Sequence, residues 1–384
     1  MYQEFLNFLL HEDNELISIN NFNWYYKDLF DWEDYFYSQN KRIVYFGKKK
    51  DNSKYQVIVK KIKINNNYEH ILKEIYFLVC CKNNSNFTQI VDMFLSDNNN
   101  YIFIILKYEG VSLQNLLNCQ DFEYWKIKGF IKHVIFQIIS GLNILHKVKL
   151  IHNDIKPSNI LITGDGQTKI CDFGSLDIAG DTRLSTIYYC SPDSLLQKTT
   201  DQKDDMWSVG VIMLGLYKRN QTFFKSNNPY YDSLSRNEKK VQQLKDVLSK
   251  FEITVDNNRK IDIKNYNDFN RIIQIIQSNS YDQNNFKSEL KSACLADIDD
   301  PDAIEFLYNL LEINPKKRFT AEQALKSNYF LNVLVNNEND IKKNEINYNE
   351  KDYNLLLNNV NDGFIFLNNI KLIKQKFLGQ VLFE

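Results

Sequence analysis

Four polar side chains that could perform chemistry lie in mostly apolar sequence. Residues 151–159 read IHNDIKPSN, which supplies a carboxylate at Asp154, an amine at Lys156 and an amide at Asn159. A second carboxylate, Asp172, follows in the sequence CDFG. A carboxylate can accept a hydrogen bond from a hydroxyl group, an amine can neutralise an anion, and carboxylate and amide oxygens are hard ligands for Mg²⁺. An isolated acid is usually a solvated surface group, but the apolar neighbours of these acids argue against that interpretation.

The elements that precede these residues are predicted to be mainly strands. Alternating and β-branched residues predict strands within DYFY, RIVYFGK and YQVIVKKI, all between residues 32 and 62, and again within FTQIVDMF and YIFIILKY. One helix is expected among them, because residues 68–81, YEHILKEIYFLVCC, have helical apolar spacing.

Helical patterns dominate after residue 110. Residues 124–147 are largely apolar and predict a long helix buried in a core. The IHNDIKPSN segment then leads into a predicted hairpin with its turn at Asp165–Gly166. Further helices are predicted over residues 203–217, 302–312 and 320–327.

Composition limits the classes of function. The chain has 384 residues, 43% hydrophobic, and a net charge of −1, which provides no basic field for binding nucleic acid or an anionic membrane. The N-terminus carries acids where a secretory signal would be basic, so cytosol or nucleus is the expected location. The six cysteines show no metal-binding spacing and are interpreted as reduced, packed thiols.

The spacing HxDxKxxN from His152 to Asn159 resembles the catalytic loop of protein kinases, and the DFG at residues 172–174 resembles their metal-binding motif. More kinase-like motifs follow in the family's order. They are Val57–Lys60 for VAIK, Glu74 for the partner of its lysine, Ser191–Asp193 for APE, Asp205–Gly210 for DxWSxG, and Arg318 for the arginine that pairs with the APE acid.

The resemblance implies an α+β, two-lobed protein kinase fold, with a small antiparallel β-sheet and one main helix in the N-lobe and a larger helical C-lobe. It divides the chain into an N-terminal extension (1–31), a kinase domain (32–331, with N-lobe 32–106 and C-lobe 110–331) and an Asn/Lys-rich tail (332–384). Both a helix and disorder are compatible with the tail.

The resemblance also implies a serine/threonine protein kinase that transfers the γ-phosphate of ATP to protein hydroxyl groups. Such transfer requires positioning and charge neutralisation more than covalent chemistry. Asp154 would accept a hydrogen bond from the substrate hydroxyl, and Lys156 would neutralise charge on the γ-phosphate. Asn159 and Asp172 would bind Mg²⁺ or Mn²⁺. His152 is expected to pack as a structural residue, and the resemblance names no regulatory partner.

A nucleotide site is implied as well. Lys60 would hold the α- and β-phosphates while Glu74 holds Lys60. The remaining expected nucleotide-binding positions are Tyr37, Val44, Tyr108 and Leu161. The phrase DPDAIEFLYNLLEINPKKRFTAEQALKSNYF is similar to the group of cyclin-dependent and MAP kinases, although Cys190 stands where that group usually has arginine.

The expected phosphate-binding hairpin departs from the family pattern. Its three glycines are replaced by Tyr37, Gln39 and Arg42. Glycine lets backbone N–H groups approach phosphates closely, so their loss predicts weaker ATP binding. Ile58 replaces the small alanine of VAIK and should tighten the adenine pocket. Asn153 replaces the arginine that receives an activation-loop phosphate in the family.

Three functions are compatible with these residues. The first is an active serine/threonine kinase with weakened ATP affinity. The second is a pseudokinase, a binding or scaffold protein that kept the fold. The third is a small-molecule kinase. The loss of the glycines and the presence of Ile58 both affect the nucleotide site. They leave Asp154, Lys156, Asn159 and Asp172 intact, which favours the active kinase.

Overall fold

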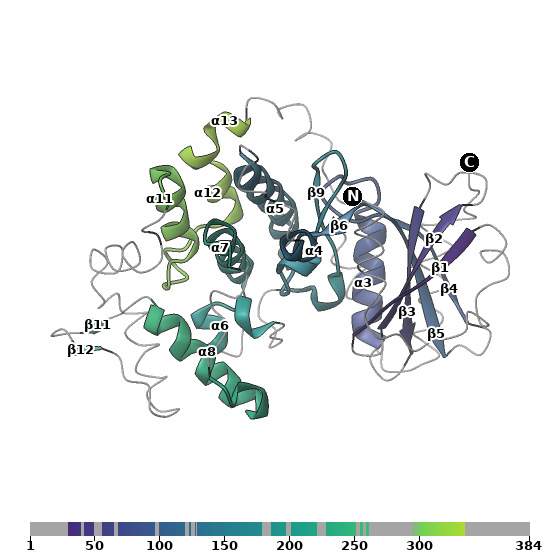
Figure 1. The fold of residues 1–384 in the computed structure, drawn as a ribbon, viewed down its shortest axis with the longest axis horizontal. Helices are drawn as coiled ribbons and strands as arrows, with labels where there is room; N and C mark the ends of the chain where they lie inside the picture. The colour runs from purple at the N-terminus through teal and green to yellow at the C-terminus, as the bar shows by residue number, and fades with distance from the viewer. Residues whose placement is uncertain are drawn as a thin grey trace. The chain divides into compact units, whose positions relative to one another are not determined.

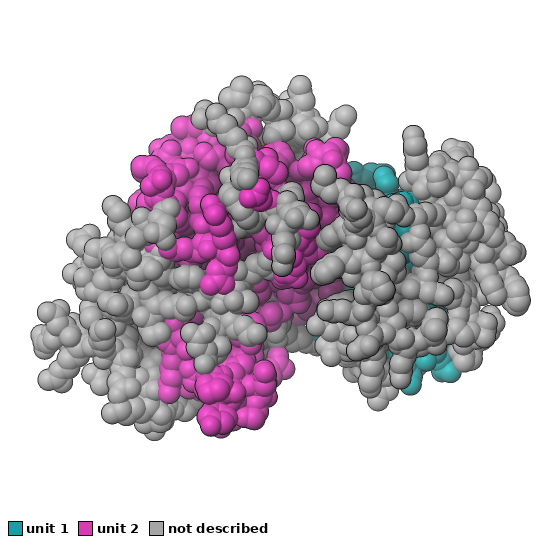
Figure 2. Space-filling view, viewed as in Figure 1, with its two compact units in different colours: residues 1–109, 346–384 teal, residues 110–345 magenta. Residues whose placement is uncertain are grey.

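The computed structural model separates into two compact units, residues 1–109 with 346–384, and residues 110–345 (Figure 2). The residues that it describes are 30–39, 42–49, 56–64, 68–96, 100–119, 123, 127, 129–178, 186–196, 201–220, 228–250, 254–255, 259–260, 295 and 298–334. The predictions for the N-terminal extension before residue 30 and for the tail after residue 334 lie outside this set.

The first unit contains a five-stranded antiparallel sheet with strand order β1-β2-β3-β5-β4 and helix α3 against it (Figure 1). The element bounds are β1 Phe30–Gln39, β2 Arg42–Lys49, β3 Gln56–Lys63, α3 Tyr68–Cys80, β4 Ile90–Leu95 and β5 Tyr101–Lys107. Each strand and the helix overlap the segment that the apolar pattern predicts, although β1 begins at Phe30, four residues before DYFY; the small sheet with one main helix is confirmed.

Burial explains why these segments fold as they do. Val57 and Val59 alternate along β3 and are completely buried, as expected of β-branched residues on the inner face of a sheet. Every residue of helix α3 from Ile71 to Cys80 is buried. A helix that is buried all round gives the few charged groups that it carries, Glu74 among them, little access to water.

The second unit is mainly helical, and α5 and α7 pack against each other at its centre (Figure 1). Helices α11 and α12 cover this pair. The helix bounds are α4 Leu113–Asn118, α5 Phe130–Lys147, α6 Pro192–Leu196, α7 Gln202–Tyr217, α8 Arg236–Lys250, α11 Pro301–Leu310, α12 Ala321–Leu325 and α13 Leu331–Leu334. The described residues of this unit also form single turns of 3-10 helix: η2 Pro157–Asn159, η3 Phe173–Ser175, η4 Ile187–Tyr189, η5 Tyr231–Ser233 and η6 Asn328–Phe330.

The long central helix differs from its prediction at one end. Helix α5 begins at Phe130 rather than at residue 124, and Ile127 is part of a bend. Gly129 precedes the helix with φ 78°, a left-handed conformation that glycine adopts without strain. The backbone therefore changes direction at Gly129, although the apolar pattern continues across it.

Short strands shape the loops around the predicted catalytic segment. A three-stranded sheet has the order β6-β8-β9, and β7 pairs with β10. Their bounds are β6 Val111–Ser112, β7 Leu150–Ile151, β8 Ile160–Ile162, β9 Thr168–Ile170 and β10 Asp177–Ile178. The predicted hairpin joins β8 to β9, and Gly166 in its turn has φ 85°. In the described part of the chain, none of the helices combines the length and apolarity that a bilayer crossing requires.

Candidate active site

The carboxylate of Asp154 is the centre of a hydrogen-bond network in the second unit. Its Oδ2 accepts from Lys156 Nζ at 2.7 Å and from Asn159 Nδ2 at 3.1 Å. Its Oδ1 accepts from Thr186 Oγ1 at 2.8 Å, and Lys156 Nζ also donates to that hydroxyl at 3.0 Å. A carboxylate held by three donors has a fixed orientation, which a group that must receive a substrate hydroxyl requires.

The backbone around Asp154 is fixed from the helical core. Asp205 of α7 is almost fully buried, and its carboxylate accepts from His152 N at 2.9 Å and from Asn153 N at 3.0 Å. It also contacts His146 Nε2 at 3.0 Å. These contacts hold the loop in place even though Asn153 has φ 63°, a strained left-handed conformation.

His152 has a structural role, as the sequence predicts. It is fully buried, and its ring packs edge-on against Phe173 at 5.5 Å. Its Nδ1 accepts from Asp154 N at 3.2 Å, so its Nε2 carries the proton and donates to the carbonyl oxygen of Cys171 at 3.1 Å. Both ring nitrogens are therefore engaged within the protein.

The two predicted metal ligands lie on adjacent strand ends. Asn159 immediately precedes β8, and its carbonyl oxygen accepts from the amide of Cys171, the residue before Asp172, at 3.0 Å. The Asn159 amide nitrogen donates to the backbone oxygen of Asp154 at 2.8 Å, which leaves Oδ1 as the side-chain atom that could bind a cation. One amide oxygen and one carboxylate suit Mg²⁺, which usually takes one or two protein carboxylates and completes its shell with water and phosphate oxygens. The residues present therefore fit the metal.

The predicted phosphate-binding pair lies in the first unit. Lys60 in β3 forms an ion pair with Glu74 in α3, and both side chains are buried. The strand register aligns Tyr37, Val44 and Lys60 across β1, β2 and β3. Tyr108 follows β5, where its ring packs edge-on against Phe46 at 5.2 Å.

The structure thus forms two groups of predicted site residues. Tyr37, Val44, Lys60, Glu74 and Tyr108 belong to the first unit, and Asp154, Lys156, Asn159, Leu161 and Asp172 belong to the second. Leu161 lies in β8 opposite Lys169 of β9. Asp172 precedes the turn η3 with φ 63°.

The segment after Thr186 is packed between helices of the second unit. Ser208 of α7 donates to the carbonyl oxygen of Tyr189 at 2.8 Å. Burial raises the pKa of Tyr189 to about 12, with a further contribution from the charge of Asp154. Burial likewise raises the pKa of the Cys190 thiol, so this side chain stays neutral at physiological pH.

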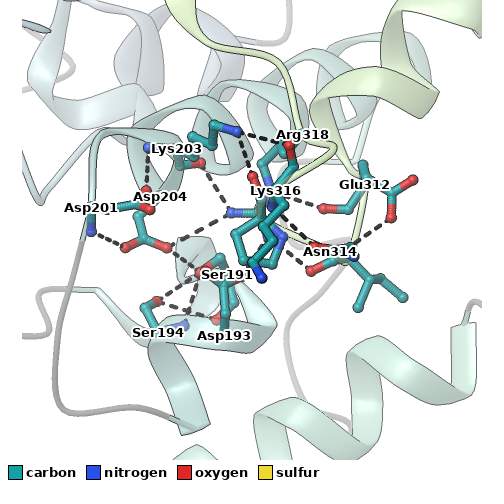
Figure 3. Close-up of polar contacts among 12 residues, drawn as sticks. Ser191, Asp193, Ser194, Asp201, Lys203, Asp204, Glu312, Asn314, Lys316 and Arg318 are labelled. Atoms are coloured by element: carbon teal, nitrogen blue, oxygen red, sulfur yellow. Dashed lines mark hydrogen bonds and ion pairs between the residues drawn. The ribbon is translucent and has the colours of Figure 1, made fainter. Parts of the chain in front are cut away.

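A buried ionic network lies under this segment (Figure 3). Arg318 is fully buried and pairs with Asp193, and its Nη1 lies 3.8 Å from Oδ1 of Asp204. Burial disfavours the charge of Arg318, but Asp193, Asp204 and Asp201 together outweigh it and raise the pKa of the guanidinium. Ser191 donates to Asp204, whose own pKa is raised by burial and by the nearby charge of Asp193.

Comparison with known proteins shows which protein family the chain belongs to. A family model described as "Protein kinase domain" matches residues 43–330. The chain belongs to the protein kinase family. The family and the two-lobed α+β fold predicted from the sequence are thereby confirmed.

Two curated protein kinases illustrate the similarity to this chain. Serine/threonine-protein kinase SSN3 of Candida albicans is 30% identical over 275 residues, which cover 67% of this chain and 44% of that protein. Mitogen-activated protein kinase HOG1 of Saccharomyces cerevisiae is 29% identical over 245 residues, 62% of this chain and 49% of that protein. The kinase chain therefore spans about half the length of these relatives.

Solved structures agree with the kinase fold. MAP kinase LmaMPK10 from Leishmania major has a TM-score of 0.62 at 18% identity, covering 91% of this chain and 95% of that chain. A chain of the yeast RNA Pol II CTD kinase CTDK-1 complex has a TM-score of 0.59 at 24% identity, covering 83% of this chain and 94% of that chain. At these identities the likeness shows the fold alone.

Sequence reasoning about this protein kinase did not foresee three contacts. The role of Asp205 in holding the loop amides was not predicted, although the DxWSxG spacing marks the residue. The bond from Asn153 Nδ2 to the carbonyl oxygen of Ser175, at 3.2 Å, has no signal in the sequence. Asp204 stands beside Asp205 as a second buried acid, and the sequence gives no reason to expect it near Arg318.

Proposed function

We propose that this chain is a serine/threonine protein kinase that transfers the γ-phosphate of ATP to protein hydroxyl groups through a glycine-free phosphate loop. The observation that carries the proposal is the network at Asp154. One carboxylate is held by Lys156, Asn159 and the Thr186 hydroxyl. The Thr186 contact supports the proposal, because a hydroxyl group lies 2.8 Å from Oδ1 of Asp154, within the range that an acceptor serine or threonine would need.

The residues then have separate tasks in the transfer. Asp154 orients the substrate hydroxyl and accepts its hydrogen bond as the oxygen attacks the γ-phosphorus. The bond between that phosphorus and the β–γ bridging oxygen breaks, and ADP leaves. Lys156, 2.7 Å from Asp154, stabilises negative charge on the transferred group. The proton of the hydroxyl is passed to Asp154 or to solvent.

Several residues would take part in nucleotide binding. Lys60, oriented by its ion pair with Glu74, would bind the α- and β-phosphates. Val44 and Tyr37 would contact the nucleotide as part of the expected phosphate-binding hairpin, and Tyr108 and Leu161 would contact the nucleoside. Membership in the family implies ATP and Mg²⁺, and Asn159 and Asp172 would hold the metal. When bound, the metal neutralises phosphate charge and orients the phosphate oxygens.

A transfer assay tests the proposal. Phosphorylation of a serine and threonine peptide array is measured at millimolar MgATP for the parent protein, Lys60→Met and Asp154→Asn. We expect transfer by the parent and at least a hundredfold less by either variant. If the three proteins label the array at one rate, the activity comes from a contaminant and the proposal fails.

A pseudokinase is the second candidate, and one observation favours it. The hairpin of β1 and β2 has bulky residues at the three glycine positions, and no glycine precedes Gly47 in the chain. A pseudokinase would keep the Lys60–Glu74 and Asp154 contacts for stability alone. It would show no transfer at any ATP concentration, and Asp154→Asn would leave its binding partners unchanged.

A further inference from the structure

A helix that carries several cations lies beside the segment that contacts Asp154. Helix α8 packs against the turn η4 and against α6 within the second unit (Figure 1). The turn η4 begins directly after Thr186, whose hydroxyl donates to Asp154. Tyr188 of η4 packs against Tyr231 with the rings tilted and their centroids 5.6 Å apart. We therefore expect a peptide whose hydroxyl reaches Asp154 to pass close to the N-terminal half of α8.

This half of α8 has three cations within five residues. Arg236 is exposed, and Lys239 and Lys240 are half-buried. Lys239 lies over the Tyr231 ring at 5.7 Å and donates to the backbone oxygen of Asp232 at 3.1 Å. Among the residues that the structure describes, Lys240 has no ion-pair partner. Burial lowers the pKa of Lys240, and the like charge of Arg236 lowers it further.

An acid within the same stretch of α8, Glu238, is already engaged. The Glu238 carboxylate accepts from the amide of Ser235 at 2.8 Å and so caps the helix. The charges of Asp154 and Asp204 reach the Cys190 thiol, as do those of Arg236 and Lys240, and both acids take part in the networks described above. Cys190 itself adds no counter-charge, because burial keeps its thiol neutral.

We propose that Lys240 and Arg236 bind an anionic side chain of the protein substrate, a carboxylate or a phosphate group, close to the phosphoacceptor hydroxyl. The inference rests on the proposed function and adds the substrate class to it. An extended peptide advances about 3.3 Å per residue, so an anion within about four residues of the acceptor can lie up to about 13 Å from Asp154.

Peptide kinetics test this preference. The substrates share one acceptor serine in a neutral sequence and carry glutamate, phosphoserine, alanine or lysine at each position within four residues of it. At one or more positions, we expect the anionic peptides to exceed the lysine peptide in kcat/KM by about fivefold for each cation engaged, mainly through KM. The glutamate and phosphoserine series distinguish a carboxylate from a phosphate ligand.

Charge variants identify the cations. Lys240→Glu should reverse the preference at the sensitive position, so that the lysine peptide becomes the better substrate, and Arg236→Ala should reduce it. Lys245→Ala is the matched control, because it removes a cation from the same helix more than one turn away. Equal kcat/KM for all peptides, or a preference that Lys240→Glu leaves unchanged, overturns the inference while transfer itself still supports the kinase.

If no phosphate transfer occurs, a binding measurement tests whether Lys240 and Arg236 bind an anionic peptide. A fluorescent peptide with alanine in place of the acceptor and three glutamates around it is titrated with the full chain, and its anisotropy is followed at low and high salt. The parent should bind this probe more tightly than a lysine-containing probe, and Lys240→Glu should abolish the difference. Identical affinities of the parent and the variant for both probes would exclude the anion site.

Discussion

The side chain of Asn153 donates a hydrogen bond from Nδ2 to the backbone carbonyl oxygen of Ser175, 3.2 Å away. The contact joins the catalytic loop to the residue after Phe173 and Gly174 without any phosphate. In the family an arginine at the position of Asn153 receives the activation-loop phosphate. Here a neutral amide makes a direct link instead.

Activity should therefore depend little on phosphorylation of the activation segment. Peptide phosphorylation by phosphatase-treated and untreated protein should differ by less than about tenfold, or about 1.4 kcal/mol in the barrier. Mass spectrometry of both samples confirms that the phosphate was removed. A greater loss of rate would mean that another basic residue receives an activating phosphate.

Nucleotide binding should require a divalent cation. Asn159 and Asp172 offer hard oxygens beside one another, and their ligand set is complete only with phosphate oxygens. ATP should raise the melting temperature by a degree or more with Mg²⁺ or Mn²⁺ and should have no effect in EDTA. Asp172→Asn should lose most of the metal-dependent shift. If ATP raises the melting temperature equally in EDTA, Asn159 and Asp172 do not bind a metal together with the nucleotide.

The glycine-free hairpin should give a high KM for ATP. One or two missing N–H contacts to phosphate cost roughly 1.5–3 kcal/mol each, so affinity should be lower by about tenfold to a few hundredfold than with the glycines. Gln39→Gly should lower the KM, and Arg42→Ala should raise it. Ser38→Gly is the control, because the family needs no glycine there. A KM unaffected by Gln39→Gly would show that this turn does not contact the phosphates.

Removal of Arg318 should strongly destabilise the second unit. Arg318→Met leaves the carboxylates of Asp193 and Asp204 buried without their cation, which costs about 3–5 kcal/mol of unfolding free energy. Lys317→Met removes an exposed neighbouring cation and should change it by less than about 0.5 kcal/mol. Urea unfolding followed by circular dichroism measures both. Adding Asp193→Asn to Arg318→Met should recover part of the loss, and a further loss would contradict this explanation.

Stability should fall above pH 9 partly because of Cys190. Burial raises the pKa of its thiol, followed by the charges of Asp204 and Asp154, so the folded protein keeps a proton that the unfolded chain loses. Unfolding free energy then decreases as pH rises past the ordinary thiol pKa of 9.0. The decrease for one such thiol is about 1.4 kcal/mol by pH 10.

Urea unfolding at pH 8 and pH 10 checks this linkage. Cys190→Ala should lose less stability between the two pH values than the parent does. Cys119→Ala, which removes a half-exposed thiol, should lose as much as the parent. If Cys190→Ala loses as much unfolding free energy between pH 8 and pH 10 as the parent does, the thiol of Cys190 ionises in the folded state.

The elements with regular patterns could be predicted from the sequence. Residues 203–217 carry an apolar pattern with an acid-rich start, and α7 spans Gln202–Tyr217. The boundary of α5 was wrong because the backbone turns at Gly129 while the apolar residues continue on both sides. Periodicity reports which side chains can be buried, and it does not report where the chain turns.

The candidate site could be predicted only where its residues are close in sequence. Asp154, Lys156 and Asn159 fall within six positions, so the loop that they form brings them together. The contacts of Asp205 with His152 and Asn153 join residues 52 and 53 positions apart. Such contacts depend on the packing of α7 against β7 and α5, which one sequence does not reveal.

The tie between Asp205 and the loop also bears on hydrogen exchange. Two successive amide groups, those of His152 and Asn153, donate their protons to one carboxylate of α7, a helix that is buried from Asp204 to Leu216. They can reach solvent only when α7 separates from the loop, so their exchange reports opening of the core rather than motion of a surface segment. A small molecule that acted by distorting this loop would therefore have to work against the folding stability of the whole second unit.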